Sequence, residues 1–183
     1  MSKGRFIAVV GPSGVGKDSI MAGIKAALPQ VRLVRRIITR PPGLGGEDYD
    51  PVSPERFDQM ARAGAFCLHW SAHGLCYGIP TDVVDATRAG TDCLANLSRR
   101  ALPEAAALFD RFVVLNITAS PETLAARLAG RARETPAEIR QRLERAQMGF
   151  APGGDTVTIR NDGPLPDAVA SAVAALNQMT VRP

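Results

Sequence analysis

Two glycines and a lysine near the N-terminus have the spacing of a phosphate-binding loop. Gly11 is followed, after four residues, by Gly16 and Lys17. Glycines let the backbone turn tightly and point successive N–H groups inward, where they cradle phosphates together with the positive end of a following helix. Lys17 adds a point charge for the β- and γ-phosphates. We therefore predict an ATP site made by Gly11, Pro12, Ser13, Gly14, Val15, Gly16, Lys17, Asp18 and Ser19.

The residue after the lysine departs from the usual pattern. Asp18 stands where a Ser or Thr hydroxyl ordinarily holds Mg²⁺, and Ser19 comes one position later. Three alternatives are open: Asp18 binds the metal directly or through water, Ser19 does so with a shifted backbone, or ATP itself holds the metal. A carboxylate is a hard oxygen ligand, and it repels a triphosphate unless a cation lies between them. We therefore favour Asp18 as a hypothesis.

The elements around this loop satisfy the context that the motif needs. The apolar run RFIAVV (5–10) predicts a strand before the loop, and residues 17–28 predict a helix after it, stopped by Pro29. Glycine-rich matches of this kind also arise by chance as simple turns, so the strand and the helix are what favour a nucleotide loop.

Strands and helices alternate along the rest of the chain. Helix starts with a capping hydroxyl occur at Ser53-Pro54-Glu55 and Ser120-Pro121-Glu122. We expect loops over 41–51 and 71–80. Further strands are predicted over 33–39, 65–70, 91–98, 111–118 and 155–162, and further helices between 98 and 111, over 135–148 and over 165–179. Near-continuously apolar strands predict an α/β fold, with a central parallel sheet flanked by helices on both faces in three layers.

Composition limits the class of protein. The chain has 183 residues, 45% hydrophobic and 22% charged, which suits one compact domain over 1–183 with no membrane span. Three cysteines without metal-ligand spacing predict reduced thiols and a cytoplasmic location. The net charge of +4 comes almost wholly from arginine, whose fork matches phosphate oxygens. The sequence has no lysine-rich tail of the kind that would predict nucleic-acid binding.

Several motifs occur in the order of guanylate-kinase-like proteins: GPSGVGKDS, RRIITRPP, HGLCYG, RLAGRARE and NDG. More closely, the chain resembles the ribose 1,5-bisphosphate phosphokinases of bacterial phosphonate breakdown. These have the same aspartate after the loop lysine, an R-x-I-T-R stretch and a loop similar to H-x-x-G-L-x-Y-G. The resemblance covers nearly the whole chain and implies a P-loop kinase fold with an acceptor-binding insert near 35–80 and a lid near 128–140.

The departures from guanylate kinases have a physical meaning. Guanine recognition needs polar groups aimed at the base, and a buried unpaired group costs about 1–3 kcal/mol. Aligned on Tyr77-Gly78, the positions that read the base in guanylate kinases hold Leu68 and Ile79, and their acidic D-x-D becomes Asn96 and Ser98. Gly43 replaces an arginine. This pattern predicts a phosphorylated acceptor without a base.

The resemblance implies that ATP phosphorylates α-D-ribose 1,5-bisphosphate to 5-phospho-α-D-ribose 1-diphosphate (PRPP), with Mg²⁺. The attacking oxygen belongs to the C1 phosphate, which is largely dianionic at neutral pH because its second pKa is about 6. No strong general base is then required, and catalysis rests on positioning and on cancelling charge. The partner expected is this small phosphosugar, not nucleic acid or a membrane; the oligomeric state is not predicted.

Arginines are the expected phosphate ligands. On an extended strand Arg36 and Arg40 share a face, which makes them acceptor-phosphate candidates, against the alternative of a solvated cluster. Arg131 and Arg133 follow a helix where a lid would cover the γ-phosphate, and the resemblance ranks them, with Lys17, as catalytic. The resemblance ranks these two above Arg127, Arg140 and Arg142, which could be ordinary helix-surface charges.

Other candidates come from the acceptor insert and from the last predicted strand. His73 lies in a glycine-bearing loop near Tyr77 and could bind ribose hydroxyls or phosphate, although a lone histidine is more often a packed or surface residue. Asn161 and Asp162 resemble the segment that flanks the adenine in related kinases, where backbone contacts would dominate. The full set of acceptor candidates is Arg36, Arg40, Glu47, His73, Tyr77, Asn96 and Ser98.

Two rival functions remain open on sequence alone. A nucleoside-monophosphate kinase, guanylate kinase included, would need altered base contacts. A non-catalytic guanylate-kinase-like binding module is less favoured, since such modules typically lose the glycine loop or its lysine, and Gly11, Gly16 and Lys17 are intact.

Overall fold

The computed structural model describes residues 3–43, 47–129 and 155–180 of the chain. The chain divides into two compact units, one of residues 1–8 and 29–112 and the other of residues 9–28 and 113–183. We call them the acceptor unit and the nucleotide unit, after the candidate residues that each contains. No helix in the described ranges combines the length and the apolar character needed to cross a membrane.

The main sheet confirms the predicted α/β architecture. Its strands are hydrogen-bonded in the order β2-β7-β1-β8-β9. The pairs β2–β7 and β8–β9 are parallel, and all five residues of β1 are buried, as expected for a strand covered on both faces. The strands are β1 (Phe6–Val10), β2 (Arg32–Leu33), β7 (Cys93–Asn96), β8 (Phe112–Thr118) and β9 (Thr156–Arg160).

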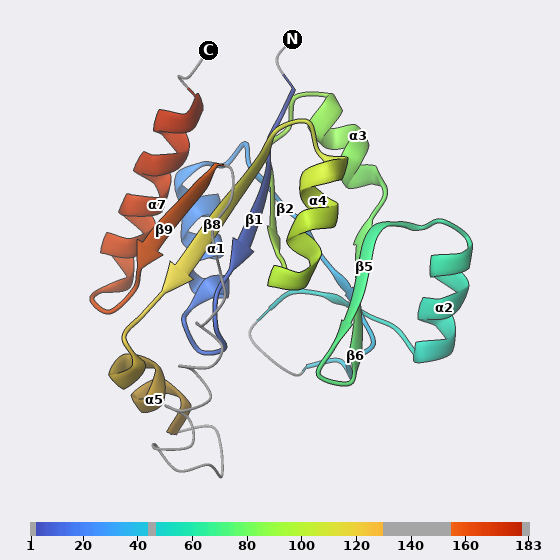
Figure 1. Cartoon of the computed structure of the whole chain (residues 1–183), viewed down its shortest axis with the longest axis horizontal. Coiled ribbons are helices and arrows are strands. Elements are labelled where there is room, and N and C mark those ends of the chain that lie inside the picture. The colour runs from blue at the N-terminus through green and yellow to red at the C-terminus, as the bar shows by residue number, and fades with distance from the viewer. Residues whose placement is uncertain (1–2, 44–46, 130–154, 181–183) are drawn as a thin grey trace. The chain divides into compact units, whose positions relative to one another are not determined.

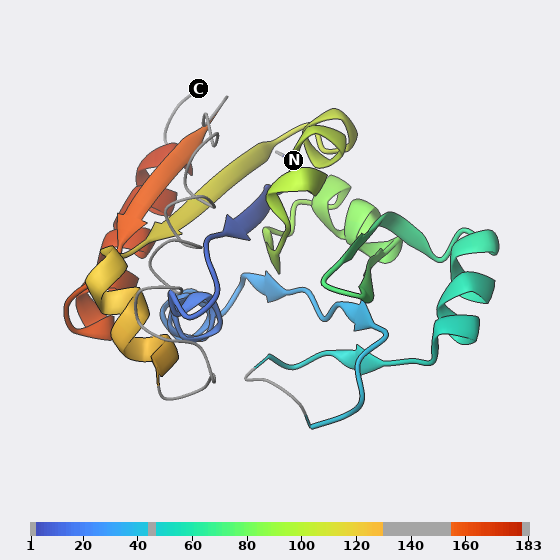
Figure 2. The ribbon, with the colours of Figure 1, turned by 60° about the horizontal axis from the view of Figure 1, so that its bottom comes forward.

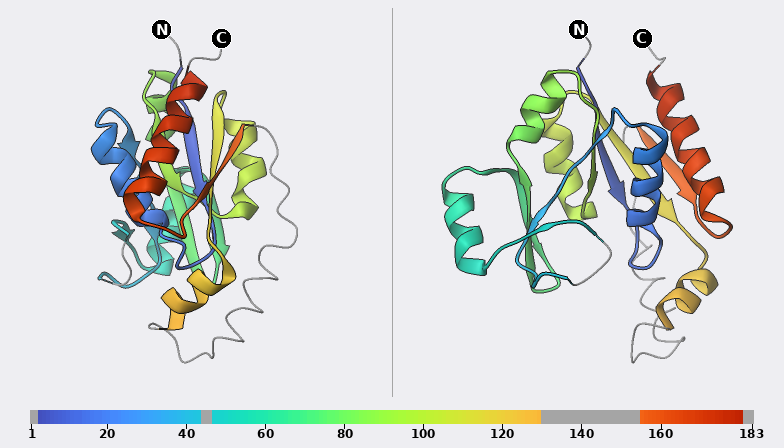
Figure 3. Two further views of the ribbon diagram at one scale, coloured as in Figure 1. Left: turned by 90° about the vertical axis from the view of Figure 1, so that its left-hand side faces the viewer. Right: turned by 180° about the vertical axis from the view of Figure 1, so that it is seen from behind.

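In the nucleotide unit, helices α1 (Lys17–Ala27) and α7 (Leu165–Thr180) lie side by side (Figures 1 and 3). Both were predicted, with bounds that differ by one residue. They approach closely because Gly23 has no side chain: an added Cβ would lie 2.5 Å from Val169 Cγ2. Helix α5 (Pro121–Ala129) follows β8 and begins at the predicted capping site, where the Ser120 hydroxyl accepts a 3.2 Å hydrogen bond from the backbone N–H of Thr123.

The acceptor unit contains a second sheet in the order β4-β3-β6-β5. Its strands are β3 (Ile37–Ile38), β4 (Asp50–Pro51), β5 (Phe66–Ala72) and β6 (Leu75–Pro80). Helix α2 (Pro54–Arg62) lies beside β5 (Figure 2) and starts as predicted, with Ser53 Oγ accepting from the backbone N–H of Arg56. Phe57 of α2 stacks on Phe66, with ring centres 4.7 Å apart.

The expectation of a loop over 71–80 was wrong. β5 and β6 form an antiparallel hairpin with Ala72 opposite Leu75, so only His73 and Gly74 form the turn. Their φ angles are 52° and 73°, and positive φ at both central residues is what matches a two-residue turn to the twist of the strands. His-Gly between two apolar runs was a hairpin signal, because histidine tolerates the left-handed region better than most residues.

The expectation of one strand over 33–39 was also wrong. The chain pairs with β7 only as far as Leu33 and then crosses to the second sheet, where Ile37 and Ile38 pair with β4 and β6. Within the predicted range only Leu33, Ile37 and Ile38 lie in strands. β-propensity indicates neither where a strand is interrupted nor which partner it will pair with.

The other helices within the described ranges lie in the acceptor unit. Helix α3 (Asp82–Arg88) was not anticipated. The helix expected between the strands ending near 98 and beginning near 111 is present as a 3₁₀ turn (Arg99–Ala101) followed by α4 (Leu102–Leu108). The helix predicted over 135–148 lies outside the described residues.

The three cysteines are free thiols, as predicted. Burial raises the pKa of the thiols of Cys67 and Cys93 to about 11, so both stay protonated at neutral pH. Each donates a weak hydrogen bond to a backbone carbonyl.

Candidate active site

The phosphate loop connects β1 to α1 within the nucleotide unit. Gly14 and Gly16 have φ angles of 81° and 95°, which glycine adopts without strain. Space is restricted as well: an added Cβ would lie 3.0 Å from Leu128 Cδ2 at Gly14 and 2.7 Å from Asn161 Nδ2 at Gly16. Gly16 is also the N-cap residue of α1 and has no side chain with which to cap it. The first N–H groups of the helix are thus presented at its positive end, which fits a phosphate ligand.

Lys17 is held against its own loop. Its Nζ donates hydrogen bonds to the carbonyl oxygens of Gly11, at 2.8 Å, and Pro12, at 3.2 Å. These contacts place the ammonium inside the turn made by the glycines. A cation held beside a glycine-rich turn suits the charge of a polyphosphate.

Asp18 and Ser19 occupy adjacent positions in the first turn of α1 and differ in environment. Asp18 is half-buried and Ser19 is exposed. Successive helix residues point about 100° apart, so both cannot face the same side of the loop. No group of three or more His, Cys, Asp or Glu side chains that could hold a metal occurs in the described parts of the chain. The Asp18 carboxylate is a hard oxygen donor that could hold a metal beside the loop.

Asn161, at the end of β9, joins the phosphate loop through its side chain. Asn161 is 4% exposed, and its Nδ2 donates a 2.8 Å hydrogen bond to the carbonyl oxygen of Val15. The sequence predicted backbone contacts to the nucleotide at this position, whereas the structure shows a side-chain contact to the loop. No sequence pattern indicated it, since 146 residues separate the two partners.

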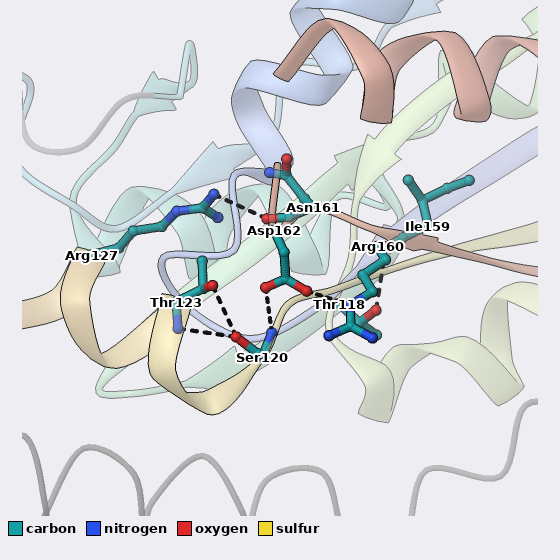
Figure 4. Close-up of polar contacts among 8 residues, drawn as sticks. All are labelled: Thr118, Ser120, Thr123, Arg127, Ile159, Arg160, Asn161 and Asp162. Carbon is teal, nitrogen blue, oxygen red and sulfur yellow. Dashed lines mark hydrogen bonds and ion pairs between the residues drawn. The ribbon is translucent and has the colours of Figure 1, made fainter. Parts of the chain in front are cut away.

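The interpretation of Arg127 as an ordinary surface charge was wrong. From α5, its Nη1 donates to the Val15 carbonyl at 3.3 Å and its Nη2 donates to the Asn161 carbonyl at 3.0 Å. Figure 4 shows the side chain reaching from α5 toward Asn161. A guanidinium can bridge two carbonyls in this way because its donors form a planar fork.

Asp162 anchors the start of α5. Its Oδ1 accepts a 2.7 Å hydrogen bond from the backbone N–H of Ser120, and its Oδ2 pairs with Arg160 (Figure 4). The Arg160 side chain, followed by the Ser120 N–H, holds the pKa of the Asp162 carboxyl well below its usual range. Asp162 is thus a structural carboxylate in this unit, stable as an anion.

In the acceptor unit, Arg36 and Glu47 form a bidentate ion pair. Arg36 Nε donates to Glu47 Oε1 at 2.6 Å and Nη2 donates to Oε2, and the two side chains are 7% and 14% exposed. The guanidinium stands 4.9 Å from the ring centre of Tyr77 and 6.0 Å from that of Trp70, which stack on each other. The structure thus brings together three acceptor candidates, Arg36, Glu47 and Tyr77.

Arg40 lies over a different ring. Its guanidinium is 5.3 Å from the ring centre of Tyr49, whose hydroxyl donates a 2.5 Å hydrogen bond to the Pro41 carbonyl. Tyr49 is 8% exposed and belongs to the cluster of Ile38 and Tyr77. Sequence reasoning missed it, although it is the only tyrosine besides Tyr77 and two residues from Glu47.

The other acceptor candidates lie in a hairpin turn, before the 3₁₀ turn and at the end of β7. His73 is an exposed turn residue. Ser98 caps the 3₁₀ turn, its Oγ accepting from the backbone N–H of Arg100 at 3.3 Å, and half-buried Asn96 ends β7. Arg131, Arg133 and the rest of the expected lid after Ala129 lie outside the described residues.

Comparison with known proteins identifies the family. No family model matches the chain. The chain is 51% identical over 176 residues to the ribose 1,5-bisphosphate phosphokinase PhnN of Ruegeria sp. (strain TM1040), covering 96% of this chain and 93% of that protein. It is 44% identical over 176 residues to PhnN of Agrobacterium fabrum, covering 94% and 96%. The chain belongs to the ribose 1,5-bisphosphate phosphokinase family.

The fold of this ribose 1,5-bisphosphate phosphokinase family member is that of guanylate kinases. The crystal structure of guanylate kinase from Anaplasma phagocytophilum matches 99% of the chain, and 88% of that protein, with a TM-score of 0.74 at 19% identity. The predicted guanylate-kinase-like α/β fold and the family resemblance are both confirmed.

The structure describes the surroundings of Leu68 and Ile79, two positions at which the sequence was predicted to depart from guanylate kinases. Leu68 and Ile79 are directly opposite each other in the β5–β6 hairpin and are 1% and 0% exposed. Both side chains are therefore packing groups of the second sheet. Apolar groups at these two positions can offer no hydrogen bond to a base edge.

Proposed function

We propose that the protein transfers the γ-phosphoryl group of ATP to α-D-ribose 1,5-bisphosphate, giving ADP and 5-phospho-α-D-ribose 1-diphosphate. The observation that carries this proposal is the 51% identity, over almost the whole of both chains, to a protein named for that substrate. The phosphate loop supports the phosphoryl-transfer chemistry, and buried Leu68 and Ile79 support an acceptor without a base.

In the proposed reaction an oxygen of the C1 phosphate attacks the γ-phosphorus, and the bond from that phosphorus to the oxygen bridging it to the β-phosphate breaks. No proton has to be removed from the nucleophile, because the C1 phosphate is largely dianionic at neutral pH. The protein then contributes alignment and positive charge. In this proposal Lys17 and the loop N–H groups bind the β- and γ-phosphates, and Arg131 and Arg133 neutralise the transferred group.

Acceptor binding is proposed for the residues around Tyr77. Arg40 supplies the phosphate-binding guanidinium, and the Arg36–Glu47 pair presents a carboxylate that can accept hydrogen bonds from ribose hydroxyls. Arg36 adds charge to this site as well, although Glu47 balances it. His73, Asn96 and Ser98 are proposed as further hydroxyl contacts.

Mg²⁺ is the proposed metal of the reaction. Bound to the triphosphate, it withdraws charge from the β- and γ-phosphates. Asp18 is the proposed protein ligand, because its carboxylate is half-buried in the first turn of α1 beside Lys17. The three reduced thiols support the proposal that the enzyme works in the cytoplasm.

ADP release from ATP and Mg²⁺, with ribose 1,5-bisphosphate and GMP offered separately, tests the proposal. Turnover with the bisphosphate alone is expected. Turnover with GMP would replace the proposal with a nucleoside-monophosphate kinase. ATP binding without turnover on either acceptor or on any other phosphosugar would favour the binding module.

A further inference from the structure

The carbonyl oxygen of Val15 is the acceptor of two hydrogen bonds from outside the phosphate loop. Asn161 Nδ2 donates to it at 2.8 Å from the end of β9, and Arg127 Nη1 donates at 3.3 Å from α5. The contact with Asn161 is fully buried. All three residues belong to the nucleotide unit.

The orientation of this carbonyl also sets the orientation of the backbone N–H of Gly16, which can donate a hydrogen bond to a phosphate. The carbonyl of Val15 and the N–H of Gly16 belong to one planar trans peptide, so they point in opposite directions. Gly16 is the N-cap residue of α1 and has a φ of 95°, a conformation with few steric restraints for glycine. Hydrogen bonds that hold the Val15 carbonyl therefore aim the Gly16 N–H to the other side of the peptide.

The two donors are themselves held in place. Arg127 Nη2 bonds to the Asn161 carbonyl at 3.0 Å, and the Asn161 N–H donates to the Thr118 carbonyl at 2.7 Å. Asp162 binds the N–H of Ser120 just before α5 (Figure 4). Residues 161–162 thus bind both ends of α5. These contacts hold Arg127 and Asn161, the two donors to the Val15 carbonyl, in position.

We propose that Asn161 and Arg127 are positioning residues of the phosphate loop, which act on ATP through the Val15–Gly16 peptide. This inference rests on the proposed function, because it assumes that the loop binds the triphosphate. Loss of either donor lets the peptide rotate, so that the Gly16 N–H spends less time aimed at the phosphates.

Two buried asparagines provide a matched pair of variants. Asn161 and Asn116 are 4% and 6% exposed, and the Oδ1 atom of each is buried without a hydrogen-bond partner among the described residues. Asn116 Nδ2 donates to Thr158 Oγ1 at 3.3 Å, within the β8–β9 pair. Asn161→Leu and Asn116→Leu therefore each remove one side-chain hydrogen bond with a neutral residue of similar shape, and only the first bond reaches the phosphate loop.

The experiment compares ATP binding by calorimetry, without any sugar acceptor, and the amide signal of Gly16 by NMR. Asn161→Leu is expected to weaken ATP binding about tenfold, with a shifted or broadened Gly16 amide signal in the ATP-bound protein, and Asn116→Leu to leave both within about twofold. Equal ATP affinity in Asn161→Leu and the wild type, or the same loss in both variants, would overturn the inference. Failure of the wild type to bind ATP would instead overturn the proposed function.

Arg127 gives a second route if Asn161→Leu does not fold, because its side chain is only half-buried. Arg127→Lys keeps the charge and loses the planar fork, whereas Arg127→Met loses both. Both are expected to weaken ATP binding and to shift the Gly16 amide signal. Full recovery of ATP affinity in Arg127→Lys, with Arg127→Met weak, would show that charge alone matters and would contradict the positioning role.

Discussion

Arg36 and Glu47 form a nearly buried ion pair, in which Arg36 Nε donates a 2.6 Å hydrogen bond to Glu47 Oε1. The guanidinium also lies 4.9 Å from the ring centre of Tyr77. A pair this well enclosed is costly to break on one side only, because the remaining charge has no partner.

Glu47→Gln is therefore expected to destabilise the protein by about 2–3 kcal/mol, since an amide accepts hydrogen bonds but does not balance the charge of Arg36. Urea unfolding measures the change. Asp48→Asn is the matched control, because Asp48 pairs with Arg35 at 3.3 Å with 78% of its side chain exposed, and its loss is expected to cost less than about 0.5 kcal/mol. If both variants lost the same free energy of unfolding, the Arg36–Glu47 pair would stabilise the protein no more than the exposed pair does.

The Phe66 ring leaves no room for a side chain at Gly78. A Cβ added at Gly78 would lie 2.6 Å from Cδ1 and Cε1 of the Phe66 ring. Gly78→Ala is thus expected to cost about 1–3 kcal/mol through overpacking, measured as the free energy of unfolding. Gly163→Ala is the control, since no atom lies within 4 Å of its added Cβ. Replacing Phe66 with Leu in the Gly78→Ala protein should recover part of the loss, and no recovery would argue against the steric explanation.

Asp92 makes stability depend on pH. Burial by itself would raise the pKa of Asp92, but hydrogen bonds from Arg5 outweigh burial and lower it. Arg5 Nε donates to the Asp92 carboxylate at 3.0 Å, and the Arg5 backbone N–H donates to it at 2.7 Å. A lowered pKa in the folded state stabilises the protein above the unfolded value of about 3.9. This contribution is lost as the pH falls through the folded pKa.

The wild type should therefore lose more stability between pH 6 and pH 3 than Asp92→Asn does, as measured by urea unfolding at each pH. Asp110→Asn provides the comparison, because the pKa of Asp110 is also lowered, by Lys3, in a pair whose side chains are 57% and 53% exposed. Because solvent screens the exposed Asp110–Lys3 pair, Asp110→Asn should change the pH dependence of stability less than Asp92→Asn does. A pH profile unaltered by Asp92→Asn would disprove the assignment.

Asp18→Asn tests the proposed metal ligand. The amide keeps the shape of Asp18 but loses its charge, so the Mg²⁺ concentration for half-maximal ADP release should rise roughly tenfold, or about 1.4 kcal/mol. Ser19→Ala distinguishes the alternative: if the exposed Ser19 hydroxyl holds the metal, that variant shows the larger rise. Unchanged metal dependence in Asp18→Asn would sink the hypothesis.

The sequence alone determined the features that depend on interactions between residues close together in the chain. The glycine spacing before Lys17 predicted the phosphate loop, since only nearby backbone conformation is involved. Ser53 and Ser120 were correctly predicted to cap helices because a cap and its N–H partner are three residues apart. The near-continuously apolar strand 6–10 was equally clear from its own residues.

Tertiary structure decided which distant groups meet. The sequence could not show that Arg127 and Asn161 both bind the Val15 carbonyl, since 112 and 146 residues separate them from it. It grouped Arg36 with Arg40 by strand periodicity, yet the two lie over different rings, Tyr77 and Tyr49. Periodicity reports the face of a strand, whereas the partner on that face depends on how the chain folds back on itself.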